Sequence, residues 1–167
     1  MKEFLVAGAV VEHDGRLLLV RNRRRGGFVD WSTPGGVIDA ADASPRAGLT
    51  REVEEETGLR VLEWEGPLYD VVAVATDMGW TMRCEVYRAL SFEGTIRVDD
   101  PDGIVEEAVF LSAAEAARRL AESLVWVREP LAEWLAERWE GAARRAYRYE
   151  LRGREWHDFE VLRTAAG

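Results

Sequence analysis

The stretch of sequence that decides the fold runs from residue 35 to residue 59. It reads Gly35-Gly36-Val37-Ile38-Asp39, then, after four residues, Ser44-Pro45, and then Arg51-Glu52-Val53-Glu54-Glu55-Glu56-Thr57-Gly58-Leu59. Ser44 is a good N-cap, Pro45 fits the first helical position and Gly58 supplies a left-handed stop. The sequence therefore predicts a turn at the two glycines and a helix from about Pro45 to Thr57.

Four acidic residues lie within five positions near the end of this helix. Glu52 precedes Glu55 and Glu56 by one turn, so these three share a face, whereas Glu54 points elsewhere. The helix dipole disfavours anions in the last turn by a few tenths to about 1 kcal/mol each, and neighbouring like charges add a similar cost. A bound divalent cation would offset this repulsion, because hard ions such as Mg²⁺ prefer clustered carboxylate oxygens. A solvated acidic face is the alternative interpretation.

The order of diglycine turn, capped helix, arginine, spaced glutamates and stop glycine resembles the Nudix box, the fingerprint of the Nudix hydrolase family. The segment from Arg51 to Leu59 matches the second half of that box without exception. The first half departs from it, because the box of this chain, from Gly36 to Leu59, is one residue longer than the family spacing.

We place the extra residue in the loop between Asp39 and Ser44, because the helix aligns from Ser44 onward. This placement leaves open whether Asp42 or Asp39 meets Arg51. Gly48, inside the predicted helix, costs up to about 1 kcal/mol relative to alanine unless close backbone packing requires it.

The resemblance implies the family fold, an α/β/α sandwich with a mixed β-sheet. It also implies that Glu52 and Glu56 are the main metal ligands, that Glu55 is a further ligand or a base, and that the carbonyl of Gly35 contributes. Arg51 is placed to hold a carboxylate in a fixed orientation and completes the predicted catalytic set. Mg²⁺ is the implied cofactor, with Mn²⁺ as an alternative.

The implied reaction is attack of water on phosphorus in a diphosphate linkage, with a carboxylate accepting the proton. In the family a further acidic ligand or base usually comes from a later loop. Asp102, Glu106 and Glu107 are the candidates in this chain.

The rest of the chain predicts a mixed sheet, two more helices and a short extension. Strands are expected at residues 4–11, 16–20, 29–33, 60–65, 69–75, 81–89 and 107–111, with a hairpin turn at Asp14-Gly15. Helices are expected from Ala113 to Ala121, after a capping box, and from Pro130 to Gly141. We assign residues 1–141 to the Nudix domain and residues 142–167 to a C-terminal extension, a β-hairpin that covers a sheet edge or joins a partner.

Composition restricts the class of protein. The chain has 167 residues and a formal net charge of −9, which disfavours nucleic acid polymers but allows a small phosphorylated ligand whose charge a metal neutralises. Cys84 is the single cysteine, so no intrachain disulfide forms, and the apolar stretch near the N-terminus is too short to span a membrane. These features predict a cytoplasmic protein that does not enter a membrane.

The substrate is less well defined by sequence. Trp31 and Trp80 are candidates to stack on a base, and Arg21, in a basic run, is a candidate phosphate contact. Core packing and a solvated loop are the alternative interpretations. A nucleoside triphosphate pyrophosphatase, with oxidised nucleotides as one option, is the first hypothesis. The alternatives are an ADP-ribose or nucleotide-sugar pyrophosphatase, and a non-catalytic nucleotide sensor. The extension could also form a homodimer contact or a lid.

Overall fold

The computed structural model describes residues 1–166, which form two β-sheets with helices on both sides. The larger sheet contains β1 (Lys2–Val10), β5 (Gly35–Val37), β6 (Arg60–Ala75), β7 (Trp80–Glu93), β9 (Arg145–Arg152) and β10 (Glu160–Thr164). Its strands follow the order β10-β9-β6-β7-β1-β5. β1 runs parallel to β7 and β6 runs parallel to β9, while the other pairs are antiparallel. The predicted mixed sheet is therefore confirmed.

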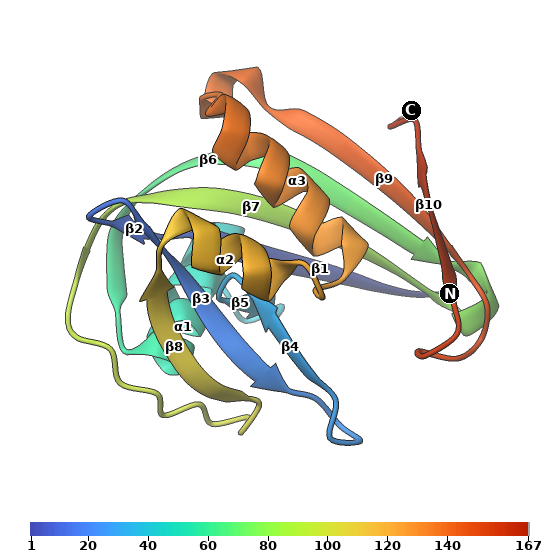
Figure 1. The fold of residues 1–167 in the computed structure, drawn as a ribbon, viewed down its shortest axis with the longest axis horizontal. Helices are drawn as coiled ribbons and strands as arrows, with labels where there is room; N and C mark the ends of the chain where they lie inside the picture. The colour runs from blue at the N-terminus through green and yellow to red at the C-terminus, as the bar shows by residue number, and fades with distance from the viewer. Residues whose placement is uncertain (167) are drawn as a thin grey trace.

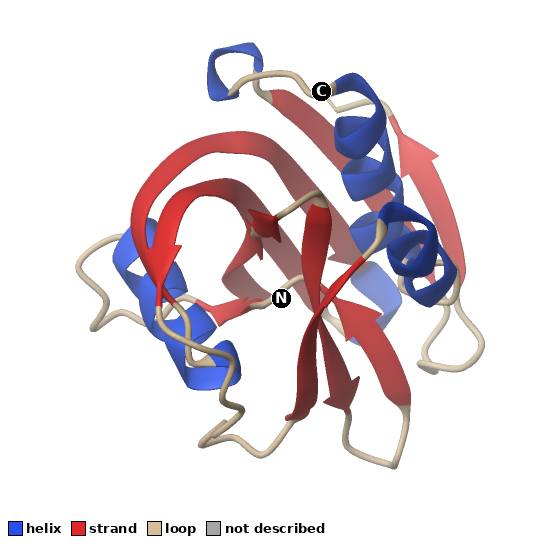
Figure 2. Cartoon of the chain, turned by 60° about the vertical axis from the view of Figure 1, so that its left-hand side comes forward, coloured by secondary structure: helices blue, strands red, loops and turns tan. Residues whose placement is uncertain are grey.

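The smaller sheet is built around β3, which has neighbours on both of its edges. Its strands are β2 (Glu12–His13), β3 (Arg16–Arg23), β4 (Val29–Ser32) and β8 (Val105–Leu111). The first expected hairpin forms only between β2 and β3, because the chain leaves the larger sheet after Val10 and enters the smaller one. Figure 2 shows the two sheets side by side.

The helices lie in two layers, as the resemblance implies. α1 (Pro45–Thr57) covers one side, and α2 (Ala113–Leu120) and α3 (Val125–Glu137) cover the other (Figures 1 and 2). Two short 3₁₀ turns complete the structure, η1 (Thr76–Met78) and η2 (Gly141–Ala143). Among the described residues, no helix is long and apolar enough to cross a membrane.

α1 has the predicted bounds and both predicted caps. The Ser44 hydroxyl accepts a hydrogen bond from the Ala47 N–H at 3.1 Å, and Gly58 adopts φ 80° and donates its N–H to the Glu54 carbonyl at 2.9 Å. These caps satisfy backbone groups that the helix ends otherwise leave without partners.

The apolar side of α1 is packed on the sheets. Leu49 and Val53 are fully buried in a core shared with Ala7, Leu18 and Tyr87. Burial of each aliphatic side chain stabilises the fold by about 1.5–3 kcal/mol. This packing fixes the helix face that carries Glu52 and Glu56.

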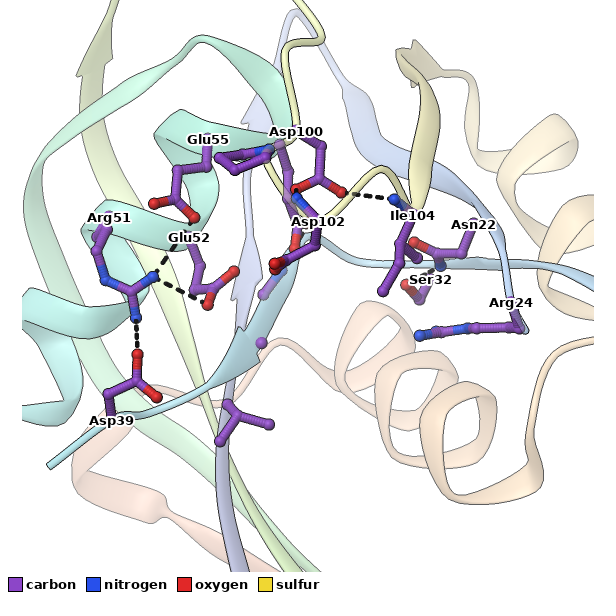
Figure 3. A pocket seen from close by; sticks show the side chains of 15 residues that line it. Asn22, Arg24, Ser32, Asp39, Arg51, Glu52, Glu55, Asp100, Asp102 and Ile104 are labelled. Carbon is purple, nitrogen blue, oxygen red and sulfur yellow. Dashed lines mark hydrogen bonds and ion pairs between the residues drawn. The ribbon is translucent and has the colours of Figure 1, made fainter.

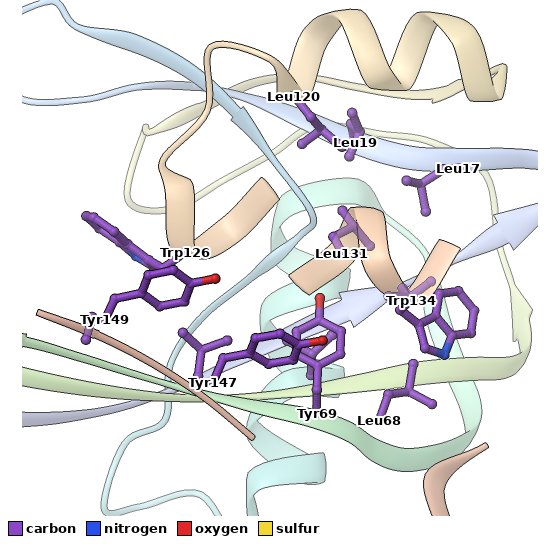
Figure 4. Close-up of a cluster of buried hydrophobic side chains, with 14 of the residues drawn as sticks. Leu17, Leu19, Leu68, Tyr69, Leu120, Trp126, Leu131, Trp134, Tyr147 and Tyr149 are labelled. Carbon is purple, nitrogen blue, oxygen red and sulfur yellow. The ribbon is translucent and has the colours of Figure 1, made fainter. Parts of the chain in front are cut away.

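The second core lies between the sheets and the helices α2 and α3 (Figure 4). Trp126, Leu131 and Trp134 of α3 pack against strands of the larger sheet, including Tyr147 and Tyr149 of β9. The expected C-terminal hairpin therefore extends the edge of that sheet beside β6. The boundary between domain and extension at residue 141 stays a prediction.

The predicted limits of the third helix are wrong. α3 begins at Val125, so Pro130 lies inside it, and it ends at Glu137. An internal proline removes one backbone hydrogen bond and costs about 3 kcal/mol in an exposed helix, and burial of the apolar face offsets that cost here. The start was missed because Leu124 provides no side-chain cap.

Candidate active site

A cavity of about 440 Å³ lies where α1, the diglycine turn, the ends of β3 and β4, and the loop before β8 meet (Figure 3). Glu52, Glu55 and Glu56 line it from α1. Gly35 and Gly36 line it from β5. The structure thus brings together every residue that the sequence predicted as a metal ligand.

Glu52 and Glu56 are nearly buried, with 9% and 7% of their surface exposed. Burial raises the pKa of Glu56 to about 8, and the nearby charge of Glu52 acts in the same direction. Burial also raises the pKa of Glu52 above its ordinary value. The Gly35 N–H donates to Glu56 Oε2 at 3.3 Å. The two carboxylates therefore stand in a site that disfavours their negative charge.

Gly36 leaves space for the carboxylate of Glu52. A Cβ atom at this position would lie 2.6 Å from Glu52 Cδ. Gly35 is packed even more closely, since its Cβ would lie 2.1 Å from the Ala7 carbonyl oxygen. Both glycines of the turn are thus required by close approach, one to α1 and the other to β1.

These residues fit a divalent cation. Within residues 1–166, no three side chains of Asp, Glu, His or Cys are already drawn together as a cation cage. The fit rests on Glu52 and Glu56, two buried carboxylates one turn apart that border an open cavity. Buried charges are normally paired or bound to metal, and hard cations prefer carboxylate oxygens.

Arg51 is the centre of a network behind these glutamates. Its guanidinium donates to Asp42 through Nε at 3.1 Å and Nη2 at 3.0 Å, and it reaches Asp39 at 3.4 Å. Nη1 donates to Glu52 at 3.2 Å and to Glu55 at 3.4 Å. Arg51 therefore orients two carboxylates of the cavity.

Asp42, rather than Asp39, is the main partner of Arg51. The hydrogen bonds from Arg51 lower the pKa of Asp42, and the Asp39 N–H adds a further hydrogen bond. The side chain of Asp39 is 66% exposed, against 10% for Asp42. Gly48 explains the fit of the irregular loop, because a Cβ there would lie 2.6 Å from Asp42 Oδ2 and 2.8 Å from Ile38 Cδ1.

A comparison with known families agrees with this geometry. The family model described as the NUDIX domain matches residues 2–135. The chain belongs to the Nudix family.

Individual relatives are similar to different extents. A MutT-like protein of Streptomyces ambofaciens is 52% identical over 56 residues, and this match covers 34% of the chain and 34% of that relative. The CTP pyrophosphohydrolase of Escherichia coli (strain K12) is 27% identical over 133 residues, covering 77% of the chain and 96% of the relative. The crystal structure of a MutT NUDIX hydrolase from Burkholderia pseudomallei has a TM-score of 0.64 and 28% identity, over 80% of this chain and 98% of that one.

The predicted Nudix fold is confirmed, and so is the prediction of a Nudix hydrolase, an enzyme class that acts on pyrophosphate bonds. Members of this family generally use a divalent metal, typically Mg²⁺. The roles of individual side chains in this Nudix site stay predictions.

Of the three later acids, the structure brings Asp102 alone to the Nudix cavity. Glu106 instead forms ion pairs with Arg23 and, at 3.3 Å, with Arg21, and neither Glu106 nor Glu107 lines the cavity. The cause is an irregularity in the pairing of β3 with β8 beside Glu106.

The three predicted substrate contacts do not line the cavity. The Trp31 ring packs on the second core and under Arg119 at 5.2 Å. Trp80 stacks on Trp156, with ring centroids 5.8 Å apart. Arg21 is engaged by Glu106. Their assignment as substrate contacts stays a prediction that the cavity lining does not support.

The sequence did not single out the polar end of the cavity. Asn22, Arg24 and Ser32 line it from β3, β4 and the loop between them. Asn22 lies directly opposite Asp30 in the pairing of β3 with β4. Arg24 belongs to the basic run, but the only signal for the other residues was their register across the hairpin, which the sequence pattern did not fix.

Proposed function

We propose that this protein is a Mg²⁺-dependent nucleoside triphosphate pyrophosphohydrolase, with oxidised nucleotides among its possible substrates. The observation that carries the proposal is the pair of nearly buried carboxylates, Glu52 and Glu56, on the border of the cavity. The similarity to a CTP pyrophosphohydrolase along 96% of that relative's length supports a nucleotide substrate.

Glu52 and Glu56 would hold the metal, with Glu55 and the carbonyl of Gly35 as further ligands. When bound, the metal neutralises diphosphate oxygens and lowers the pKa of the attacking water. Arg51 keeps Glu52 and Glu55 in place through its hydrogen bonds. Positioning and charge neutralisation supply most of the rate in phosphoryl transfer.

A carboxylate must accept the proton of the attacking water. Glu55 and Asp102 are the two candidates, because both line the cavity. Glu55 is held by Arg51 at 3.4 Å, whereas Asp102 lies on the loop before β8. Comparison of Glu55→Gln with Asp102→Asn assigns the base. A general base works only when it is deprotonated, so its loss removes the limb of the pH–rate profile in which the rate rises with pH.

The test is a panel of nucleoside triphosphates, ADP-ribose and nucleotide sugars, assayed with Mg²⁺ and with Mn²⁺ and repeated after chelation. We expect nucleoside monophosphate and pyrophosphate from the triphosphates, and no turnover without metal. Faster cleavage of ADP-ribose or a nucleotide sugar would replace the proposal with that activity. Nucleotide binding without hydrolysis of any compound would identify a sensor. Sedimentation of the same sample tests the predicted homodimer.

A further inference from the structure

Asn22 is a buried amide at the end of the cavity away from Arg51 and Glu55 (Figure 3). Only 4% of its surface is exposed. Its amide nitrogen donates to Asp30 Oδ1 at 2.8 Å and to Ser32 Oγ at 2.9 Å, which uses both of its hydrogens. Of the hydrogen bonds among residues 1–166, none ends on its amide oxygen, and this oxygen is not among the fully buried atoms without a partner, so it is accessible from the cavity that Asn22 lines.

The orientation of this amide is fixed by Asp30. The carboxylate of Asp30 is buried, with 4% of its side chain exposed, and Arg24 donates to it at 3.3 Å from Nε and at 3.3 Å from Nη2. An ionised carboxylate only accepts hydrogen bonds. Rotation of the Asn22 amide would therefore place two acceptor oxygens together, so the nitrogen stays toward Asp30.

An acceptor that is open to a cavity and has no donor within the protein can accept a hydrogen bond from a bound ligand. Phosphate oxygens do not meet this need, since they are acceptors themselves. They are also expected at the other end of the cavity, beside Glu52 and Glu56, with the metal. The nucleoside part of the substrate carries suitable donors, which are amino and ring N–H groups of the base and hydroxyl groups of the sugar.

We propose that Asn22 is a specificity-determining residue whose amide oxygen accepts a hydrogen bond from an N–H or O–H group of the nucleoside. Asp30 is then a positioning residue, because it acts through the amide of Asn22 without reaching the substrate. The inference rests on the proposed function and deepens it, since it states which chemical group of the substrate the site selects.

The test compares substrate pairs that differ by one donor. Suitable triphosphate pairs are guanosine with inosine, adenosine with purine riboside, cytidine with 2-pyrimidinone riboside, and ribose with 2′-deoxyribose. A site built to bond a donor discriminates against the analogue without it by about tenfold or more. We expect the wild-type protein to prefer the donor-bearing member of at least one pair, and that pair shows whether the donor belongs to the base or to the sugar.

Two variants separate recognition from structure. Asn22→Leu removes the acceptor at similar volume and should bring the kcat/KM ratio of the selected pair close to one. Asp30→Asn allows the amide of Asn22 to turn and should reduce or reverse the same ratio. Ser123→Ala is the matched control, because it removes a buried hydrogen bond of 2.8 Å to the Trp31 carbonyl outside the cavity. It should lower stability and leave the ratio unchanged.

The inference is overturned if, for every substrate pair, the kcat/KM ratio is the same in Asn22→Leu, in Asp30→Asn and in the wild-type protein. If no nucleotide is hydrolysed, the proposed function fails. The same ratios are then taken from dissociation constants measured by calorimetry with the same triphosphates. Ratios that the variants leave unchanged, or absence of binding, would overturn the inference in that case as well.

Discussion

Two groups of carboxylates, one on α1 and one in the loop before it, stand in opposite electrostatic environments. Glu52 and Glu56 are nearly buried, and burial raises the pKa of both. Asp42 lies against the guanidinium of Arg51, whose hydrogen bonds lower its pKa. Glu56 is in no ion pair among the described residues and Glu52 has one contact with Arg51, at 3.2 Å, so under the proposed function a cation balances this group, whereas Asp42 already accepts two hydrogen bonds from Arg51. Under the proposed function, this contrast separates the metal-binding residues from the residues that hold them in place.

The largest expected effect follows replacement of Glu52 or Glu56. We expect Glu52→Gln and Glu56→Gln each to lose at least about a hundredfold in kcat, because each removes charge from the electrostatic site. Glu54→Gln is the matched control, since Glu54 is exposed on the same helix, and it should retain wild-type turnover. Steady-state kinetics with Mg²⁺ measure the effect. Full activity in both site variants would show that these carboxylates do not bind the catalytic metal.

Gly48→Ala tests how tightly Asp42 is packed between α1 and Arg51. In an open helix this change stabilises by up to about 1 kcal/mol. Here the new methyl group would meet Asp42 Oδ2 at 2.6 Å, and Arg51 holds that atom. We expect a net loss of about 1–3 kcal/mol in the free energy of unfolding, as for other overpacked sites. Urea denaturation measures it, and a more stable variant would show that the loop moves freely.

The two aspartates beside Arg51 should differ in effect. Asp42→Asn weakens two hydrogen bonds to the guanidinium and should lower kcat/KM several-fold by loosening Glu52 and Glu55. Asp39→Asn alters one longer, exposed contact and should change little. Kinetics of the two variants under identical metal concentrations provide the comparison. Equal losses would mean that Asp39 shares the positioning role.

The last test is the pH dependence of stability in the metal-free protein. The pKa of Glu56 is about 8 in the folded state against an ordinary value of 4.5. The folded state therefore binds more protons between these values, so its stability falls as the pH rises from about 4.5 to about 8, by at most about 1.4 kcal/mol per pH unit. Denaturation in chelator at several pH values measures the slope, which should flatten in Glu56→Gln. An unchanged slope would assign it to another group.

The sequence predicted the arrangement of Glu52 and Glu56 more fully than it predicted the partner of Arg51. The caps Ser44 and Gly58 and the spacing of the glutamates are local signals, so the bounds of α1 and the shared face of Glu52 and Glu56 could be predicted. The partner of Arg51 could not be chosen, because it depends on how the irregular loop packs on Gly48.

Features that depend on strand register could not be predicted from the sequence. The pairing of Asn22 with Asp30 requires the register of β3 with β4. The position of Asp102 in the cavity, and of Glu106 outside it, requires the irregular pairing of β3 with β8. The stacking of Trp80 on Trp156 joins residues far apart in the chain.

The parallel pairing of β1 with β7 has a consequence for how the protein folds during synthesis. Lys2 lies opposite Trp80, and the core under α1 includes Val105 and Ala108 of β8. Chains emerge at about 5–20 residues per second, and a helix as short as α1 is marginal in isolation. The glutamates are therefore synthesised well before β7 and β8, which complete the core under their helix, and the non-local pairing makes folding slower than in helical domains. We expect the metal site to form only after residue 108 has left the ribosome.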